Sequence, residues 1–175
     1  GEPFSAGADL QAIVPLFMSG GVQAVAPEEE RLQQLMLRLR YAQVPTVAAL
    51  AGMALGGGCE LSVYCARRVA HIETYLGLVE VGVGLIPGGG GLTYLARRAA
   101  QERALAPDMP LMAFLKKYAL QAATAQVSKS AVEARRMGYL LDDDPIVFNV
   151  HEVLYAAIRE AVAARHGLAR AVEGA

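Results

Sequence analysis

Residues 55–61 read Leu55-Gly56-Gly57-Gly58-Cys59-Glu60-Leu61, three glycines followed two residues later by a carboxylate. Glycine lets backbone N–H groups approach a ligand closely, and the first N–H groups of a helix have no partner within it. The stretch therefore predicts a helix over residues 57–66, with an anion or oxyanion site at its start. Glu60 lies about one helical turn beyond Gly57, so its side chain can face the same side.

A second carboxylate, Glu80, precedes another glycine-rich stretch that ends in Pro87-Gly88-Gly89-Gly90-Gly91. Carboxylates are costly to bury and the neighbours of both acids are apolar, so the pair suggests general acid/base chemistry. The turn at Ala6-Gly7 can aim a further N–H group at the same point, an arrangement that suits an enolate beside a carbonyl. Taken one at a time, however, these motifs favour glycine packing, a helix-dipole role for Glu60 and a solvated loop for Glu80.

The composition fits one domain with a sizeable core, because 54% of the 175 residues are hydrophobic. Charged residues make up 19% and the net charge is −1, so neither nucleic acid nor a membrane is an expected partner. Cys59 and Cys65 lack metal or CxxC spacing and are expected to be reduced core residues, which favours a cytoplasmic protein. The histidines are scattered, so no metal site is expected; they are His71, His151 and His166.

Three other nucleotide or nucleophile motifs fail. The chain has no GxxxxGK[ST] sequence for a nucleotide-binding P-loop and no GxSxG nucleophile elbow. The stretch from Gly82 places Pro87 where a dinucleotide fingerprint needs glycine or alanine. These absences leave the carboxylates and the glycine turns as the candidate chemistry.

Short apolar runs alternate with helical patterns in the first hundred residues, which predicts an α/β fold. Residues 1–100 are expected to form the core, and residues 101–175 a helical C-terminal region of the same domain. Asp142 to Asp144 are interpreted as a solvated turn. Residues 11–26, which contain Gly20-Gly21, are predicted to form a short helix and a loop. The predicted strands are 46–51 and 69–75, with a third apolar piece at 85–87, and the further predicted helices are 27–43 from Pro27, 57–66, 88–98, 109–126, 130–138 and 151–165.

Four stretches, in this order and at these spacings, resemble the crotonase (enoyl-CoA hydratase/isomerase) superfamily. The resemblance implies a crotonase-like ββα superhelix from which the first strands and a helix are missing, so that the chain is N-terminally incomplete. The four stretches are Phe4-Ser5-Ala6-Gly7-Ala8-Asp9-Leu10, residues 45–52, residues 55–61 and residues 84–91.

By this resemblance, the backbone N–H groups of Ala6 and Gly57 form the oxyanion hole for a thioester carbonyl. Glu60 activates the water and Glu80 exchanges the proton at C2 when water adds to a trans-2-enoyl-CoA, as in fatty acid β-oxidation. The presence of both acids favours a hydratase over a pure isomerase. The residues implied to contact the acyl-CoA substrate are Ser5, Ala8, Asp9, Leu55, Gly56, Pro87 and Gly88.

Residues 109–141 are similar to the corresponding part of bifunctional β-oxidation proteins, in which a 3-hydroxyacyl-CoA dehydrogenase module precedes the hydratase. The chain is therefore expected to be part of a larger polypeptide. No cofactor is expected for this piece, and NAD only if such a module is present; the resemblance implies a homotrimer or hexamer. Two departures from the family pattern, Val79 and Ala66, are interpreted as structural. The alternatives left open are an enoyl-CoA isomerase and a non-catalytic acyl-CoA-binding or assembly module.

Overall fold

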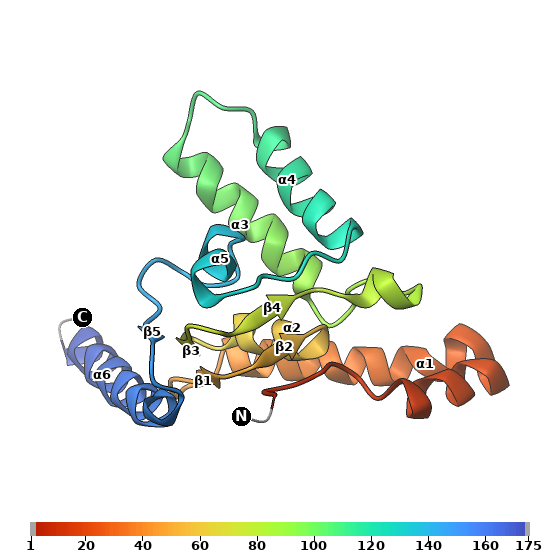
Figure 1. Ribbon diagram of the computed structural model, residues 1–175, viewed down its shortest axis with the longest axis horizontal. Helices are drawn as coiled ribbons and strands as arrows, with labels where there is room; N and C mark the ends of the chain where they lie inside the picture. The colour runs from red at the N-terminus through yellow and green to blue at the C-terminus, as the bar shows by residue number, and fades with distance from the viewer. Residues whose placement is uncertain (1–2, 174–175) are drawn as a thin grey trace.

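The computed structural model describes the backbone of residues 3–173 and the side chains up to Arg165, and within this range the strands form two small parallel sheets. One sheet has the order β1-β3-β5, with Val47 of β1 in register with Arg67 of β3. The other pairs β2 with β4 (Figure 1). The strands are β1 (Val47–Leu50), β2 (Met53–Leu55), β3 (Arg67–His71), β4 (Tyr75–Gly77) and β5 (Ile146–Val147).

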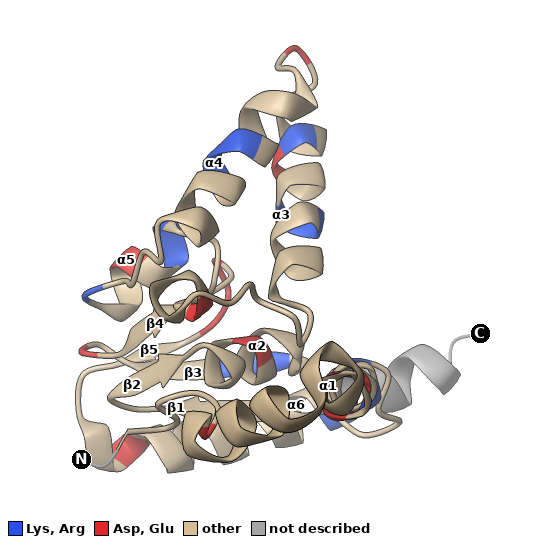
Figure 2. Ribbon diagram, turned by 90° about the vertical axis from the view of Figure 1, so that its right-hand side faces the viewer, with Lys and Arg blue, Asp and Glu red and all other residues tan. Residues whose placement is uncertain are grey.

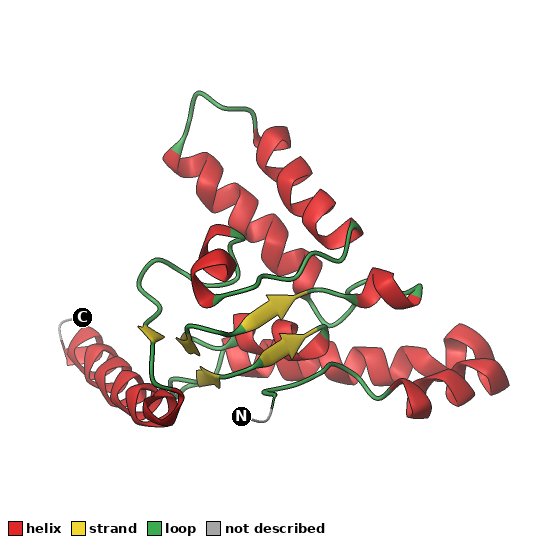
Figure 3. Ribbon diagram, viewed as in Figure 1, coloured by secondary structure: helices red, strands yellow, loops and turns green. Residues whose placement is uncertain are grey.

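The strand predicted over 46–51 is confirmed as β1, and a second strand that was not predicted, β2, follows it. Gly52, with φ of +65°, turns the chain between β1 and β2, so that the two strands join different sheets. Likewise β3 and β4 replace the strand expected over 69–75, since the N–H of Thr74 turns back to the carbonyl of His71. A helix follows each pair, α2 (Gly57–Tyr64) after β2 and α3 (Gly91–Leu105) after β4, so the chain repeats a ββα unit (Figure 3).

The segment between β4 and α3 departs from the prediction as well. Glu80 begins a short 3-10 helix, η1 (Glu80–Val83), and Leu85 and Ile86 are exposed instead of forming a third apolar strand. The chain turns through Gly84, whose φ is +78°, and then through the glycines that open α3. This loop keeps Glu80 outside any regular sheet while leaving it directly attached to β4.

The first helix, α1 (Leu10–Arg40), consists of two helical segments that meet at a kink at Gly21 (φ 60°, ψ −153°). The expected short helix is found, but the loop expected within 11–26 is reduced to this kink. The helix start expected at Pro27 is wrong because helical geometry resumes directly after Gly21. By length and composition alone α1 would be long and apolar enough to cross a membrane. Its C-terminal half, however, contacts α2 and carries the buried side chain of Met36.

The C-terminal region is largely helical and packs on the same core as the ββα units. Helices α3 and α4 (Leu111–Ala123) form an antiparallel pair that stands above the sheets in Figure 1. Ser130 caps α5 (Ala131–Arg136) by accepting the N–H of Glu133, as the capping-box pattern predicts. The last helix, α6 (Val153–Glu173), follows the 3-10 turn η2 (Val150–Glu152) and packs on β1 and β3, whereas β5 was not predicted.

The buried side chains of the main cluster come from both parts of the chain. Basic residues lie along both α3 and α4 (Figure 2). Both cysteines are free and buried, as expected. The largest fully buried apolar and aromatic side chains of the cluster are Met36, Leu50, Val63, Leu76, Leu78, Tyr118, Tyr139 and Leu140.

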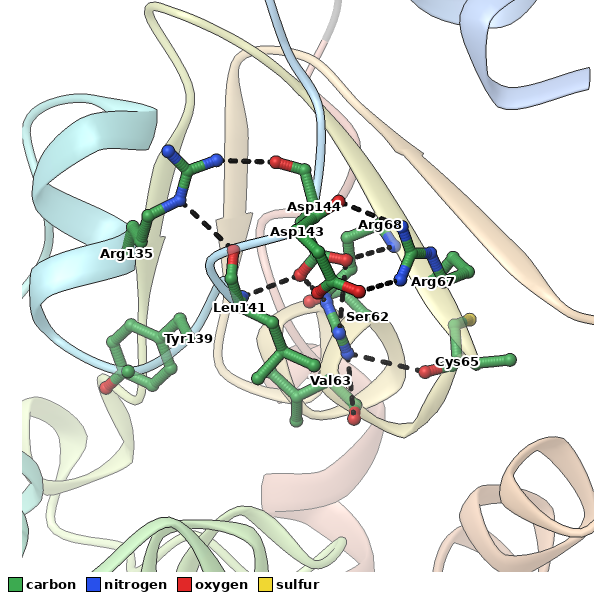
Figure 4. A network of polar contacts seen from close by, with 12 residues as sticks. Ser62, Val63, Cys65, Arg67, Arg68, Arg135, Tyr139, Leu141, Asp143 and Asp144 are labelled. Carbon is green, nitrogen blue, oxygen red and sulfur yellow. Dashed lines mark hydrogen bonds and ion pairs between the residues drawn. The ribbon is translucent and has the colours of Figure 1, made fainter. Parts of the chain in front are cut away.

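The prediction that Asp142 to Asp144 form a solvated turn is wrong for Asp144, which is only 1% exposed. Its carboxylate accepts hydrogen bonds from the Nε of Arg68 at 2.6 Å and from the N–H of Leu141 at 2.7 Å (Figure 4). Arg68 is itself buried on β3. A lone carboxylate would stay in water, but a buried arginine lies opposite this one, and no local sequence pattern reveals that partner.

Candidate active site

Glu60 is buried in the first turn of α2, where its carboxylate meets the glycine turn that opens α3. Its Oε1 accepts the N–H of Gly91 at 2.8 Å. Gly90, the N-cap residue of α3, has no side chain to cap the helix, so the carboxylate of Glu60 supplies the acceptor that a capping side chain usually provides. The glycine run at residues 88–91 therefore forms the contact surface for the carboxylate of Glu60.

The close approach requires glycine at these positions. A Cβ atom built on Gly89 would lie 2.5 Å from Oε2 of Glu60, and one built on Gly91 would lie 3.0 Å from Oε1. Any larger residue would therefore push the carboxylate out of its place. Glu60 is consequently held by backbone on two sides, which fixes its orientation without a positively charged partner.

Glu80 approaches the same region from the other side, at the start of η1. Its Oε1 lies against Gly56, since a Cβ atom built there would be 3.2 Å away, and Gly56 itself has φ of +53°. Its Oε2 is buried and has no hydrogen-bond partner among the described residues. A buried acceptor without a protein partner is suited to a water molecule or a substrate atom.

The pKa values of both acids are raised. Burial is the main cause for Glu60, whose pKa is lowered by the N–H of Gly91 and raised further by the negative charges of Glu80 and Glu29. Burial is also the main cause of the raised pKa of Glu80, to which the charge of Glu29 adds. Desolvation and like charge both disfavour the ionised form, so each carboxyl holds its proton to a higher pH than an ordinary glutamate.

The two expected N–H donors lie at adjacent turns. Gly57 is the first residue of α2, and neither its N–H nor that of Ala6 donates a hydrogen bond to another described residue. The space in front of Gly57 is open, because a Cβ atom built there would meet nothing within 4 Å. The Ala6 turn is brought close by Ser5, whose side chain packs on Gly58. Both groups are therefore available to an oxygen atom, although their role remains a prediction.

The other residues implied to contact substrate lie in these same turns, and several also have structural contacts. Ser5 accepts the N–H of Gly7 through its Oγ, and its backbone carbonyl accepts the N–H of Leu55. Asp9 is the N-cap of α1 and accepts the N–H of Gln11. Ala8 is exposed, whereas Gly56 and Pro87 are buried and Gly88 is half-buried. Their contact with substrate stays a prediction.

Sequence reasoning missed the contribution of α1 to the site. Glu29 of α1 lies against Gly88, where a Cβ atom would be only 1.7 Å from its Oε1. Gln33, one turn further along, donates its Nε2 to the carbonyl of Gly88 at 2.9 Å. Nothing in the residue types of a polar helix face signals such a long-range contact. Among the described residues, no group of three or more His, Cys, Asp or Glu side chains could hold a metal ion.

The raised pKa of Glu80 predicts how stability depends on pH. Between the ordinary glutamate pKa of 4.5 and the raised value, the folded protein binds more protons than the unfolded chain, so stability falls as pH rises. Glu80→Gln removes this dependence of stability on pH. The free energy of unfolding of the variant, minus that of the wild type, should therefore be larger at pH 7 than at pH 4. Urea denaturation at the two pH values measures this, and an equal difference at both would contradict it.

Comparison with known proteins identifies the family to which the chain belongs. A family model described as enoyl-CoA hydratase/isomerase matches residues 1–137. The chain belongs to this family. A Bacillus anthracis enoyl-CoA hydratase of known crystal structure is 30% identical, with a TM-score of 0.67, and the match covers 90% of this chain and 52% of that one. The crotonase resemblance and the α/β crotonase fold with a helical C-terminal region are therefore confirmed.

Curated relatives of this enoyl-CoA hydratase/isomerase family member are longer. A Bacillus subtilis protein named "Probable 3-hydroxyacyl-CoA dehydrogenase" is 40% identical over 161 residues, which are 90% of this chain and 19% of that protein. The human "Methylglutaconyl-CoA hydratase, mitochondrial" is 40% identical over 94 residues, which are 54% of this chain and 26% of that protein. The chain thus spans about a quarter or less of the length of these relatives.

Proposed function

We propose that this family member is an enoyl-CoA hydratase, which adds water across the double bond of a trans-2-enoyl-CoA. The observation that carries the proposal is the convergence of Glu60 and Glu80, held by two different glycine turns, on one region. Each carboxylate has a raised pKa, and one carboxylate oxygen of Glu80 has no protein partner. Two acids of this kind can exist in opposite protonation states, which hydration requires.

The reaction assigns one proton transfer to each acid. Ionised Glu60 takes a proton from water as the water oxygen bonds to C3, and the electron pair of the double bond moves toward the thioester carbonyl. The N–H groups of Ala6 and Gly57 stabilise the resulting negative charge on the carbonyl oxygen. Protonated Glu80 then gives its proton to C2, so the product is a 3-hydroxyacyl-CoA and the two acids have exchanged protonation states.

A larger protein context supports a role in fatty acid oxidation. The Bacillus subtilis relative carries the name of a 3-hydroxyacyl-CoA dehydrogenase. A hydratase forms the 3-hydroxyacyl thioester that such an enzyme oxidises, so coupling the two in one polypeptide is chemically consistent. NAD would belong to that dehydrogenase module, and the residues described here would need no cofactor. A cytoplasmic location and a trimeric or hexameric assembly belong to the same proposal.

The test is turnover of crotonyl-CoA, a short trans-2-enoyl-CoA, by the full-length protein, with the product identified by mass spectrometry. The proposal expects a product heavier by one water molecule. A 3-enoyl-CoA is the comparison substrate, because its conversion without gain of water would indicate an isomerase instead. Binding of crotonyl-CoA without turnover would overturn the proposal in favour of a non-catalytic module.

A further inference from the structure

Strand β4 has an outer edge whose N–H groups are satisfied by hydroxyl groups. The N–H of Leu76 donates to Oγ of Ser128 at 2.9 Å, and the N–H of Leu78, just after the strand, donates to the phenol oxygen of Tyr139 at 3.3 Å. Both hydroxyls come from the helical C-terminal region. The C-terminal region therefore holds β4, the strand that leads into Glu80, through the N–H groups of Leu76 and Leu78 on one edge.

The segment 77–80 joins the two halves of the site. The carbonyl of Gly77 accepts the N–H of Gly56 at 2.9 Å, and Gly56 is the N-cap of the helix that carries Gly57 and Glu60. Glu80 follows Leu78 by two residues. The phenol of Tyr139 thus contacts the backbone of Leu78, which lies between Gly77, bonded to the Gly56 turn, and Glu80.

We infer that Tyr139 is a positioning residue for Glu80, holding the Leu78–Glu80 backbone so that this carboxylate faces the C2 atom of the substrate. The inference rests on the proposed hydratase function and extends it to a residue of the helical region. Tyr139 acts through the Leu78 peptide and does not itself touch the reacting atoms.

The surroundings of Tyr139 suit this role, because its ring is fixed. Tyr139 is 1% exposed, and burial raises the pKa of its phenol, so the group stays neutral. The preceding residue, Gly138, has φ of +82°, and its carbonyl accepts the hydroxyl of Tyr94 at 2.8 Å. A Cβ atom built on Gly138 would lie 2.4 Å from the hydroxyl of Tyr118. Two tyrosines therefore enclose the turn from which Tyr139 reaches Leu78.

Tyr139→Phe in the full-length protein tests the inference. The variant keeps the ring but leaves the buried N–H of Leu78 without an acceptor, so the segment shifts and Glu80 loses its alignment. Misplacement of a reacting group by about 1 Å can lower the rate by about 100-fold, so we expect kcat for crotonyl-CoA to fall by about 10- to 100-fold with little change in KM. The alkaline limb of the kcat–pH profile, which reports loss of the Glu80 proton, should move to lower pH because a displaced carboxylate is better hydrated.

Tyr94→Phe is the matched control. It removes a buried hydroxyl of α3 that donates to the carbonyls of Gly138 and Tyr139. Because the N–H of Leu78 keeps its acceptor in this variant, kcat and the pH profile should stay much closer to wild type than those of Tyr139→Phe. If Tyr139→Phe folds poorly, 4-aminophenylalanine at position 139 keeps the ring and a polar donor but offers Leu78 no good acceptor. The same loss of kcat is expected from it.

The Glu80→Gln background separates this inference from the proposed function. There, Tyr139→Phe should lower kcat no further, because its effect operates through the missing carboxylate. If Glu80→Gln alone keeps wild-type activity, the proposed function fails. If Glu80→Gln is impaired while the position-139 variants match Tyr94→Phe in kcat and in pH profile, the proposed function stands and the positioning role of Tyr139 is overturned.

Discussion

Glu60→Gln should lower kcat for hydration of crotonyl-CoA by about two to four orders of magnitude, the usual effect of removing a general base. The glutamine side chain has nearly the same shape, and its amide oxygen can still accept the N–H of Gly91. The glycine turn that receives Glu60 should therefore remain in place. What the variant loses is the carboxylate that takes a proton from water, so the loss should appear in kcat more than in KM.

The measurement is steady-state hydration by the full-length protein, with Glu30→Gln as the control. Glu30 is exposed on α1, so its substitution makes the same change of charge and of side chain at a position that faces solvent. The control should retain wild-type kcat. Equal activity of Glu60→Gln and Glu30→Gln would remove Glu60 from the reaction and the hydratase proposal with it.

The sequence predicted the two acids because glycine is a local signal. A glycine run beside a carboxylate indicates close backbone approach wherever it occurs, and Glu60 and Glu80 are indeed attached to such turns. The residues that complete their surroundings come from distant segments. Glu29 approaches Gly88 from α1, and Tyr139 approaches Leu78 from the helical region. Their residue types are ordinary in a polar helix face or a core, so only the folded chain reveals them.

The same distinction explains the errors in the fold. The α/β alternation was predicted from apolar runs, but the run that ends before Gly52 does not indicate that a second strand, which belongs to the other sheet, follows the turn. Pro27 is typical of a helix start, yet the kink at Gly21 lets helical geometry resume before it. Asp144 was misassigned because three successive aspartates resemble a solvated turn, and its partner Arg68 lies 76 residues away in the chain.

Asp144→Ala should lower the free energy of unfolding by about 3–5 kcal/mol, because it leaves a buried arginine without its counter-ion. The Asp144 carboxylate accepts the backbone N–H and the guanidinium of Arg68 as well as the N–H of Leu141. Its own backbone carbonyl accepts from Arg135. The single carboxylate therefore joins β3 to the segment that leads into β5, and its loss unpairs several buried donors at once.

Asp143→Ala is the matched control, since the carboxylate of Asp143 is two-thirds exposed and pairs with Arg67 next to the buried pair. An exposed pair contributes about 0–1 kcal/mol, and Arg67 keeps a second partner in Glu160. Urea denaturation of the full-length protein, followed by circular dichroism and limited proteolysis, should show that the free energies of unfolding of the two variants differ by several kcal/mol. If both variants are destabilised equally, the Arg68–Asp144 pair does not hold the two segments together. The double variant Arg68→Met/Asp144→Leu should be more stable than Asp144→Ala, because the penalty arises from the unpaired buried charge and an apolar pair carries none.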